Sequence, residues 1–220
     1  MRVLVGCEES GVVRRAFAAR GHSVRSCDLL PSADSSPDHI QADVLSVLEW
    51  GWDLAIFHPV CTYMTNAAAW ALQDPDYDRW PGVGYHQRVK PGTLTGAARR
   101  MAKHEALDFV DALSRAPIER ICMENPVGAL AGHLGWPTQV VQPHWFGDDA
   151  SKATALSRKN LPPLVETCRV TPRLVDGKPR WANQTDSGQN SLTPGPNRAR
   201  DRSRTFEGLA NAMADQWGEL

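Results

Sequence analysis

Two short segments of the chain each place a reactive side chain beside a proline. In the first, the sequence HPVC at positions 58–61 puts the thiol of Cys61 just after an apolar run, residues 54–57. In the second, Glu124 begins the sequence Glu-Asn-Pro after a short strand predicted at 120–123, Arg-Ile-Cys-Met. A thiolate is a nucleophile, and a carboxyl group can hold or deliver a proton. The two segments therefore suggest a nucleophile that works with an acid.

Each segment also has a simpler interpretation. A cysteine beside an apolar run is commonly a small buried side chain without a chemical role, and Glu-Asn-Pro is also typical of a plain turn. Pro59 ends the predicted strand because it lacks an N–H for the ladder. If the two strands are parallel neighbours, Cys61 and Glu124 emerge at one edge of the sheet, where open α/β sheets bind their ligands.

The first part of the chain predicts half of a nucleotide-binding unit. Residues 2–6 predict a strand, 7–11 a polar turn, 12–17 a helix and 23–27 a second strand that ends at Asp28. An acid there accepts hydrogen bonds from ribose hydroxyls, or it simply begins a turn. The unit lacks a full G-x-G-x-x-G sequence.

Asp43 has two interpretations that spacing does not separate. It follows a short extended piece and precedes a brief helix predicted at 44–50. Its carboxylate suits either the exocyclic amine of an adenine or the N-cap of that helix.

The remaining elements frame these segments. Residues 74–96 are rich in proline, glycine and aromatic residues, which predicts a lid or binding loop. A clear amphipathic helix is predicted at 97–113, a strand at 138–142, and a closing helix at 205–217 that docks against the first strands. Prolines, Pro196 among them, exclude long regular elements between 161 and 204.

Charge is unevenly distributed along the 220 residues, although the formal net charge is only −1. Between positions 152 and 204 there are eleven Lys or Arg against four Asp or Glu, which indicates either a polyanion partner or a solvated face. Arg198, Arg200, Arg202 and Arg204 alternate, so an extended backbone would align four guanidinium groups for phosphates.

The five cysteines show no Cys-x-x-Cys pair and no clustered histidines. This pattern excludes a zinc site and a disulfide framework, so we expect no metal and reduced thiols. No apolar run approaches membrane-spanning length and no signal peptide is evident, so we expect a soluble cytoplasmic protein, in the host cytoplasm if it is viral.

Taken in order, these segments resemble the DNA (cytosine-5) methyltransferases, in particular the short forms found in bacterial viruses. The Pro-Cys and Glu-Asn-Pro segments carry most of the resemblance, which runs from Val3 to Trp217. Three features depart from the family: Val60 separates proline from cysteine, residues 8–11 replace the usual phenylalanine and paired glycines, and the arginine motif is missing. Lys152 with Thr154 is the nearest substitute by position.

The resemblance implies an α/β fold, a Rossmann-like S-adenosylmethionine-dependent methyltransferase sheet with helices on both faces and no large target-recognition domain. It implies a catalytic domain at 1–160, a basic DNA-contacting segment at 161–204, and a C-terminal helix at 205–220 that packs back. The implied cofactor is S-adenosylmethionine, and the implied partner is double-stranded DNA, bound by a monomer.

The resemblance also implies roles for individual residues. Cys61 would add to C6 of a flipped-out cytosine, and Glu124 would hold or protonate N3, aimed by the turn that contains Asn125. The residues implied for cofactor binding are Glu8, Glu9, Ser10, Gly11, Asp28, Asp43 and Pro59. Those implied for DNA binding are Lys152, Thr154, Arg198, Arg200, Arg202 and Arg204.

Other functions fit parts of the same pattern. An N6-adenine or N4-cytosine amino methyltransferase uses a related proline-rich loop without a thiol. RNA or a free nucleotide could replace DNA as the substrate, and a DNA-binding protein on a degenerate methyltransferase scaffold would need no chemistry. The sequence identifies neither the target site nor the base that removes the C5 proton.

Overall fold

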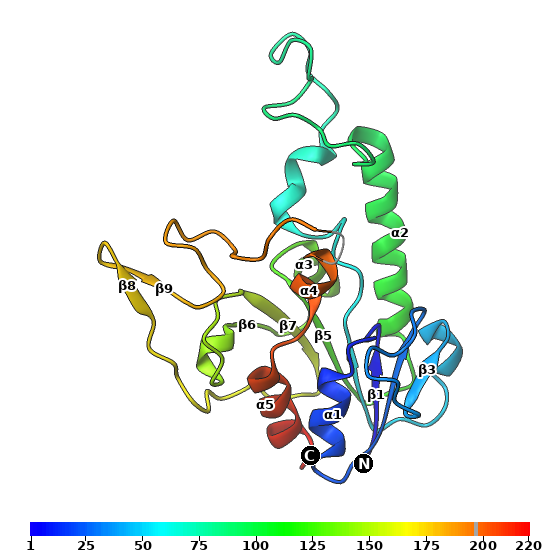
Figure 1. The fold of residues 1–220 in the computed structure, drawn as a ribbon. Coiled ribbons are helices and arrows are strands. Elements are labelled where there is room, and N and C mark those ends of the chain that lie inside the picture. Colours follow the sequence, from blue (N-terminus) through cyan, green and yellow to red (C-terminus); the bar gives the residue numbers. More distant parts are fainter. Residues whose placement is uncertain (196–197) are drawn as a thin grey trace.

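The apolar residues that precede the Cys61 segment form β4 (Leu54–Phe57), an interior strand of a seven-stranded sheet. β4 pairs in parallel with β1 (Arg2–Gly6) on one side and β5 (Arg120–Pro126) on the other. The order across the sheet is β3-β2-β1-β4-β5-β7-β6. The computed structural model describes residues 1–195 and 198–220 (Figure 1).

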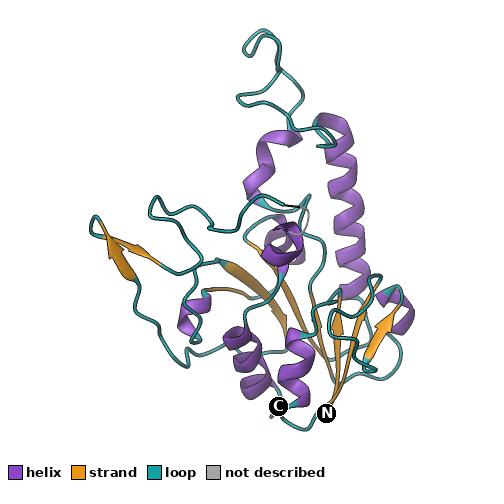
Figure 2. Ribbon diagram, in the orientation of Figure 1, coloured by secondary structure: helices purple, strands orange, loops and turns teal. Residues whose placement is uncertain are grey.

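The other strands flank this centre, and helices cover both sides of the sheet (Figure 2). The remaining strands of the sheet are β2 (Ser23–Asp28), β3 (His39–Gln41), β6 (Thr138–Val141) and β7 (Thr154–Lys159). The α-helices are α1 (Val12–Ala18), α2 (Gly96–Ser114), α3 (Ala129–Leu134), α4 (Arg198–Ser203) and α5 (Glu207–Trp217). Short 3₁₀ helices are η1 (Val44–Val47), η2 (Asn66–Leu72) and η3 (Pro143–Trp145).

Alternate residues of the central strands enter two separate cores. Leu54 and Ile56 pack with α1 and α5, whereas Ala55 and Phe57 pack with α2 and α3. Because both faces of the parallel strands are buried, these strands are continuously apolar rather than alternating. The predicted fold class, an α/β Rossmann-like sheet with helices on both faces, is confirmed.

Two features of the chain path complete this arrangement. β7, which no sequence pattern had indicated, pairs antiparallel to both β5 and β6. The closing helix α5, predicted to dock against the first strands, shares a core with Val3 and Val5 of β1 and also packs along α1. Trp217 ends this helix fully buried, and its indole N–H donates to the carbonyl of Pro162 at 3.1 Å.

Two parts of the chain project from the sheet in Figure 1. Residues 74–95, here named the loop arm, connect η2 to α2 and are held together by internal turns. Residues 169–190, the hairpin arm, contain the small sheet of β8 (Arg173–Val175) and β9 (Lys178–Arg180). Among the described residues, no helix is long and apolar enough to cross a bilayer.

Candidate active site at the carboxyl edge of the sheet

The two reactive segments follow neighbouring parallel strands. Phe57 of β4 lies opposite Met123 of β5, so the next residues, His58 and Glu124, lie beside each other. Cys61 follows in the loop after β4, partly exposed, while Glu124 is buried at 5% exposure. The topology therefore brings the predicted nucleophile and the predicted acid to one edge of the sheet.

A buried ion pair joins the two segments. His58 Nδ1 lies 2.8 Å from Glu124 Oε2, and the side chains are 11% and 5% exposed. Burial opposes both charges, but their mutual contact outweighs it: the pKa of His58 is raised, and the pKa of Glu124 is lowered by nearby Lys152 together with His58. The lowered pKa favours the ionised Glu124 carboxylate, and the raised pKa favours the protonated His58 imidazole beside it.

Asn125 and Gly128 tie the loop after β5 to the loop after β4. The Asn125 side-chain amide donates to the carbonyl of Pro59 at 2.8 Å, and Ala129 N donates to Met64 O at 2.8 Å. A Cβ on Gly128 would lie 2.1 Å from that Met64 carbonyl, so only glycine permits the approach. The position of Cys61 is thus fixed from across the sheet edge.

The net effect of the surroundings is to raise the pKa of the Cys61 thiol. Burial and the Glu124 carboxylate raise the pKa of Cys61, while Lys152 and Arg202 act in the opposite direction. Arg99 of α2, itself buried, donates to the carbonyl of Thr62 at 2.8 Å. The loop that carries the thiol therefore has a second anchor on a different helix.

Lys152 and Thr154 lie around the start of β7, beside the end of β5. Because β7 runs antiparallel, its first residues meet the last residues of β5, with Thr154 opposite Pro126. Lys152 lies close enough to lower the pKa of Glu124, and its ammonium group also contacts the carbonyl of Arg204 at 3.4 Å. The Thr154 hydroxyl is buried and donates to the Lys152 carbonyl at 3.2 Å.

The turn after β1 is held by its own polar residues. Glu8 accepts from the Val13 amide at 2.7 Å and from the Ser10 hydroxyl at 3.3 Å, so its carboxylate caps the start of α1 from within the turn. Gly11 adopts φ +69°, which favours glycine. Glu8 and Ser10 therefore shape the predicted cofactor turn more than they face outward.

Three further acids stand at the same edge. Asp28 Oδ1 accepts from Leu30 N at 2.9 Å, and Asp43 Oδ1 accepts from Leu45 N at 3.0 Å. Asp43 is the N-cap of η1, which is one of the two roles predicted for it. Glu9 forms two hydrogen bonds with the Arg200 guanidinium, at 2.6 and 2.5 Å.

The extended backbone considered for the alternating arginines at 198–204 is not what the structure shows. Residues 198–203 form helix α4 rather than an extended strand, so the four guanidinium groups do not line one side. Arg200 turns toward Glu9, whereas Arg202 and Arg204 are exposed. Pro196 lies outside the described residues.

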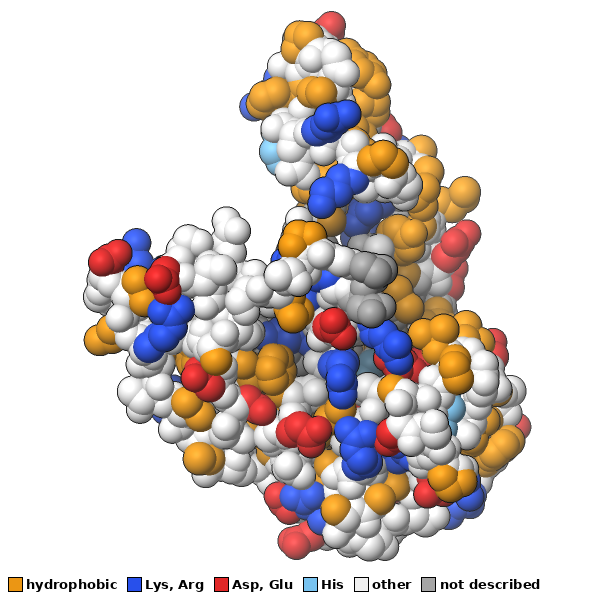
Figure 3. All heavy atoms as spheres, in the orientation of Figure 1, with side chains coloured by type: hydrophobic (Ala, Val, Ile, Leu, Met, Phe, Trp, Pro, Cys, Tyr) orange, Lys and Arg blue, Asp and Glu red, His pale blue; other side chains and the backbone are white. Residues whose placement is uncertain are grey.

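Basic side chains gather in the hollow between the loop arm and the hairpin arm. Figure 3 shows this hollow, with Lys and Arg along its floor and its upper rim. The Cys61 surroundings include cations from the chain before β7 and from α4, namely Lys152 and Arg202. The predicted DNA-contacting segment thus meets the predicted catalytic edge.

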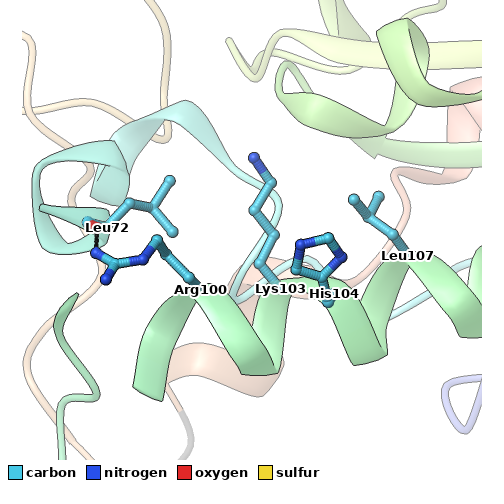
Figure 4. A pocket seen from close by; sticks show the side chains of 5 residues that line it. All are labelled: Leu72, Arg100, Lys103, His104 and Leu107. Atoms are coloured by element: carbon cyan, nitrogen blue, oxygen red, sulfur yellow. Dashed lines mark hydrogen bonds between the residues drawn. The ribbon is translucent and has the colours of Figure 1, made fainter. Parts of the chain in front are cut away.

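A separate recess of about 300 Å³ lies between α2 and the end of η2. Figure 4 shows its lining, Leu72, Arg100, Lys103, His104 and Leu107, with Arg100 donating to the Leu72 carbonyl at 2.8 Å. None of these residues is among the predicted site residues. In the described part of the chain, no cluster of three or more His, Cys, Asp or Glu could hold a metal ion.

Sequence reasoning missed three residues that build the site. His58 is part of the HPVC segment, and a histidine between a buried strand and a proline was a usable signal. Gly128 follows Glu-Asn-Pro closely, but its close contact with Met64 depends on tertiary structure. Arg99 is one of several arginines in its helix, and nothing local marks it as the buried one.

No protein-family model and no curated protein sequence matches the chain. Solved structures with some likeness include an E. coli prophage-encoded protein described as a DNA modification methyltransferase, with 12% identity, TM-score 0.42, and coverage of 71% of this chain and 45% of that chain. A Spodoptera frugiperda DNMT2 mutant has 13% identity, TM-score 0.38, and coverage of 81% and 57%. The S. pombe Dnmt2 methyltransferase has 14% identity, TM-score 0.43, and coverage of 74% and 51%.

The chain spans about half the length of these structures. Likeness at this level does not bear on activity. The fold of the chain follows instead from its own strand order and register.

Proposed function

We propose that this chain transfers a methyl group from S-adenosylmethionine to C5 of cytosine in DNA through a covalent bond between Cys61 and C6. The observation that supports it most is the pairing of β4 with β5, which places Cys61 and Glu124 after adjacent strands and ties their loops through Asn125 and Pro59. A thiol beside a buried carboxylate suits nucleophilic addition to a ring that must gain a proton.

The residues at the edge fit the proposed cofactor. Asp28 ends β2, and Asp43 closely follows the neighbouring parallel strand β3. The Oδ1 atom of each accepts a hydrogen bond from a backbone amide. Their second carboxylate oxygens are suited to the ribose hydroxyls and the adenine amine of a nucleoside. The turn from Glu8 to Gly11, with Pro59 nearby in the fold, would line the methionine end. S-adenosylmethionine would supply an electrophilic methyl group at this place.

Cys61 performs the first covalent step of the proposal. Its thiol first loses a proton to solvent. The thiolate then adds to C6 of the cytosine ring, which breaks the aromatic system and gives C5 the electron density of an enamine. After C5 is methylated, loss of its proton and departure of the thiolate restore the ring. Lys152 and Arg202, which act to lower the pKa of Cys61, favour the thiolate that this step needs.

Glu124 and Lys152 stabilise the charge that develops during the addition. As the sulfur attacks, electrons move toward N3, which is protonated through Glu124. Lys152 precedes β7, which pairs with β5 on the side away from β4. We assign its ammonium group to the base oxygen O2. The Thr154 hydroxyl, which donates to the Lys152 carbonyl, would hold the backbone of Lys152. Such preorganised contacts are worth more inside a water-poor site than in solution.

DNA is assigned to the hollow between the arms. A paired cytosine cannot reach Cys61, so it must leave the helix at a cost of roughly a few kcal/mol. Arg198, Arg202 and Arg204 of the basic segment are assigned to phosphates. Val60, 65% exposed next to the nucleophile, is placed to contact the base or the gap it leaves.

The test uses purified protein, labelled S-adenosylmethionine and duplex DNA. Wild type is expected to form 5-methylcytosine and to become covalently trapped on DNA that contains 5-fluorocytosine. Cys61→Ser should lose both, while Cys168→Ser, which alters an exposed cysteine, should keep both.

Each result bears on an alternative. Methyl transfer to an amino group that survives Cys61→Ser would show an N6-adenine or N4-cytosine enzyme. Trapping on RNA but not on DNA would change the substrate. Binding of DNA with no binding of S-adenosylmethionine would leave a DNA-binding protein without this chemistry and would refute the proposal.

A further inference from the structure

A buried histidine stands behind the proposed acid. His58 leaves β4 next to Glu124, its Nδ1 lies 2.8 Å from Oε2, and the two side chains are almost excluded from solvent. The His58 backbone amide donates to the carbonyl of Gly6 at 3.0 Å, which fixes the residue to the neighbouring strand. The pair is thus part of the sheet edge and not a surface contact.

Within the protein, Glu124 is the group placed to exchange a proton with His58. Among the described residues, the buried Nε2 of His58 has no hydrogen-bond partner. The charged groups that face the imidazole are Glu124 from β5, Glu8 from the turn after β1, and Lys152 from the segment before β7. Glu8 is held by the start of α1, so Glu124 is the group that can exchange a proton with His58.

We propose that His58 is a positioning residue that keeps Glu124 supplied with the proton that N3 takes up, so that the acid is a His58–Glu124 pair. This inference rests on the proposed cytosine chemistry and deepens it. The geometry that carries it is the buried 2.8 Å contact together with the unpartnered Nε2.

The proton balance closes within the pair. Before attack, one proton lies on His58 Nδ1, and Glu124 is a carboxylate. As the Cys61–C6 bond forms and the ring electrons move to N3, the Nδ1–H bond of His58 breaks and its proton passes to Glu124 Oε2. Glu124 delivers a proton to N3 in the same step, so the N3–H bond forms and Glu124 is a carboxylate again. The imidazole is then neutral. When the thiolate leaves C6, the N3 proton returns to Glu124 and then to His58.

The pH dependence of stability follows from the same pair. The pKa of His58 is raised above 6.5 by Glu124, against its burial, so its stabilising contact is complete below pH 6.5 and is lost as the pH rises through the folded-state value. The pKa of Glu124 is lowered below 4.5, against its own burial, by Lys152 and His58, so its contribution is present above pH 4.5 and is lost in acid.

The test is His58→Asn, because the asparagine amide can still donate to Glu124 but cannot give up a proton. The control is His133→Asn, which alters another histidine at 2.8 Å from a carboxylate, that of Asp111, on an exposed surface. The rate of adduct formation on 5-fluorocytosine DNA is measured between about pH 6 and about pH 9 in single turnover. Melting temperatures show whether each variant is folded.

In wild type the rate should rise as Cys61 ionises and should level off once the pH passes the pKa of His58, because the thiolate then gains population while the protonated imidazole loses it. His58→Asn should be slower by about 10²-fold at neutral pH and should keep rising to the top of the pH range, whereas His133→Asn should match wild type. A folded His58→Asn protein with wild-type rates, or with the same levelling, would overturn the role of His58.

A second measurement does not depend on activity. The His58 imidazole, followed by NMR in the full-length protein, should titrate above 6.5 in wild type and lower in Glu124→Gln. An unchanged titration would show that the pair does not share a proton. If wild type forms no adduct on any DNA while His58 titrates as expected, the proposed function has failed rather than the pairing, and the proton role fails with it.

Discussion

The catalytic edge and the two arms are held by different kinds of contact. At the edge, buried hydrogen bonds join segments far apart in sequence: His58 to Glu124, Asn125 to Pro59 and Ala129 to Met64, each at 2.8 Å. In the loop arm, backbone bonds connect near neighbours, as in the turns within residues 76–84. The hairpin arm combines local contacts, such as Arg173 with Asp186, with bonds at its base from Asn183 to Ser151.

This difference separates two tasks. Local bonds allow the loop arm to move or vary without disturbing the sheet, whereas the edge depends on the register of β4 against β5. The proposed chemistry therefore lies in the part of the molecule with the least freedom, and the proposed DNA contacts of the loop arm lie in a part with more. The following changes test that separation, beginning with the edge.

Gly128→Ala is expected to have the largest effect. Its Cβ would meet the Met64 carbonyl at 2.1 Å, a backbone atom that cannot move without shifting the Cys61 loop. We expect about 3 kcal/mol of lost stability by urea unfolding and a loss of more than about 10²-fold in methyl transfer. Gly132→Ala is the matched control, because that helical glycine of α3 has open space around it and should gain up to about 1 kcal/mol. Equal behaviour of the two variants would contradict a fixed edge.

Asn125→Ala should come next. It removes a buried hydrogen bond to the Pro59 carbonyl and leaves that oxygen without its partner, at a cost of about 2 kcal/mol. Asn190→Ala, in the hairpin arm, removes an exposed contact to Leu192 N and should stay within about 0.5 kcal/mol of wild type. Denaturant midpoints compare them. A small effect at Asn125 would mean that the loops are joined mainly by their backbones.

Replacing residues 75–94 with a Gly/Ser linker tests the loop arm. The sheet should remain folded, with a melting temperature near that of wild type, since the arm is bonded mostly within itself. DNA affinity should weaken, and because the arm carries Arg79, Arg88 and Lys90, the salt dependence of binding should lose a slope of about 2 to 3. Filter binding over a range of salt concentrations measures both. Unchanged DNA binding would move recognition to the hairpin arm.

The edge and the arms also differ in what sequence alone could predict. Apolar runs such as 54–57 and 120–123 marked the strands, and the prolines after them marked where chemistry could emerge, because buried parallel strands and strand ends leave local signals. The apolar patterns did not show that the two strands are neighbours. The parallel pairing of β4 with β5, on which the meeting of Cys61 and Glu124 depended, comes from the structure.

The parts that were missed depend on contacts between distant residues. The burial of Arg99 and the close approach of Gly128 are tertiary facts with no periodic pattern. The arginines at 198–204 alternate as a strand would, yet the segment forms α4, whose Arg200 pairs with Glu9. A short charged segment with no apolar face takes its conformation from such partners rather than from its own pattern.

Arg200→Ala should have the smallest effect on stability. Arg200 belongs to α4 and pairs with Glu9 in the turn after β1. The pair it forms with Glu9 is half exposed on the arginine side, so its loss should cost less than about 1 kcal/mol, as should the control Arg173→Ala. The two variants should differ in binding. Glu9, whose pKa Arg200 holds low, would face the proposed cofactor without its counter-ion.

A carboxylate without its counter-ion favours a cation. Calorimetry with Arg200→Ala should therefore show binding of S-adenosylmethionine, which carries a sulfonium charge, strengthened by up to about fivefold relative to uncharged S-adenosylhomocysteine, and the gain should shrink in high salt. Arg173→Ala should leave that ratio unchanged, because Asp186 lies in the hairpin arm, away from the turn. An identical ratio in both variants would place the methyl-bearing end of the cofactor away from Glu9 and confine α4 to the DNA side of the site.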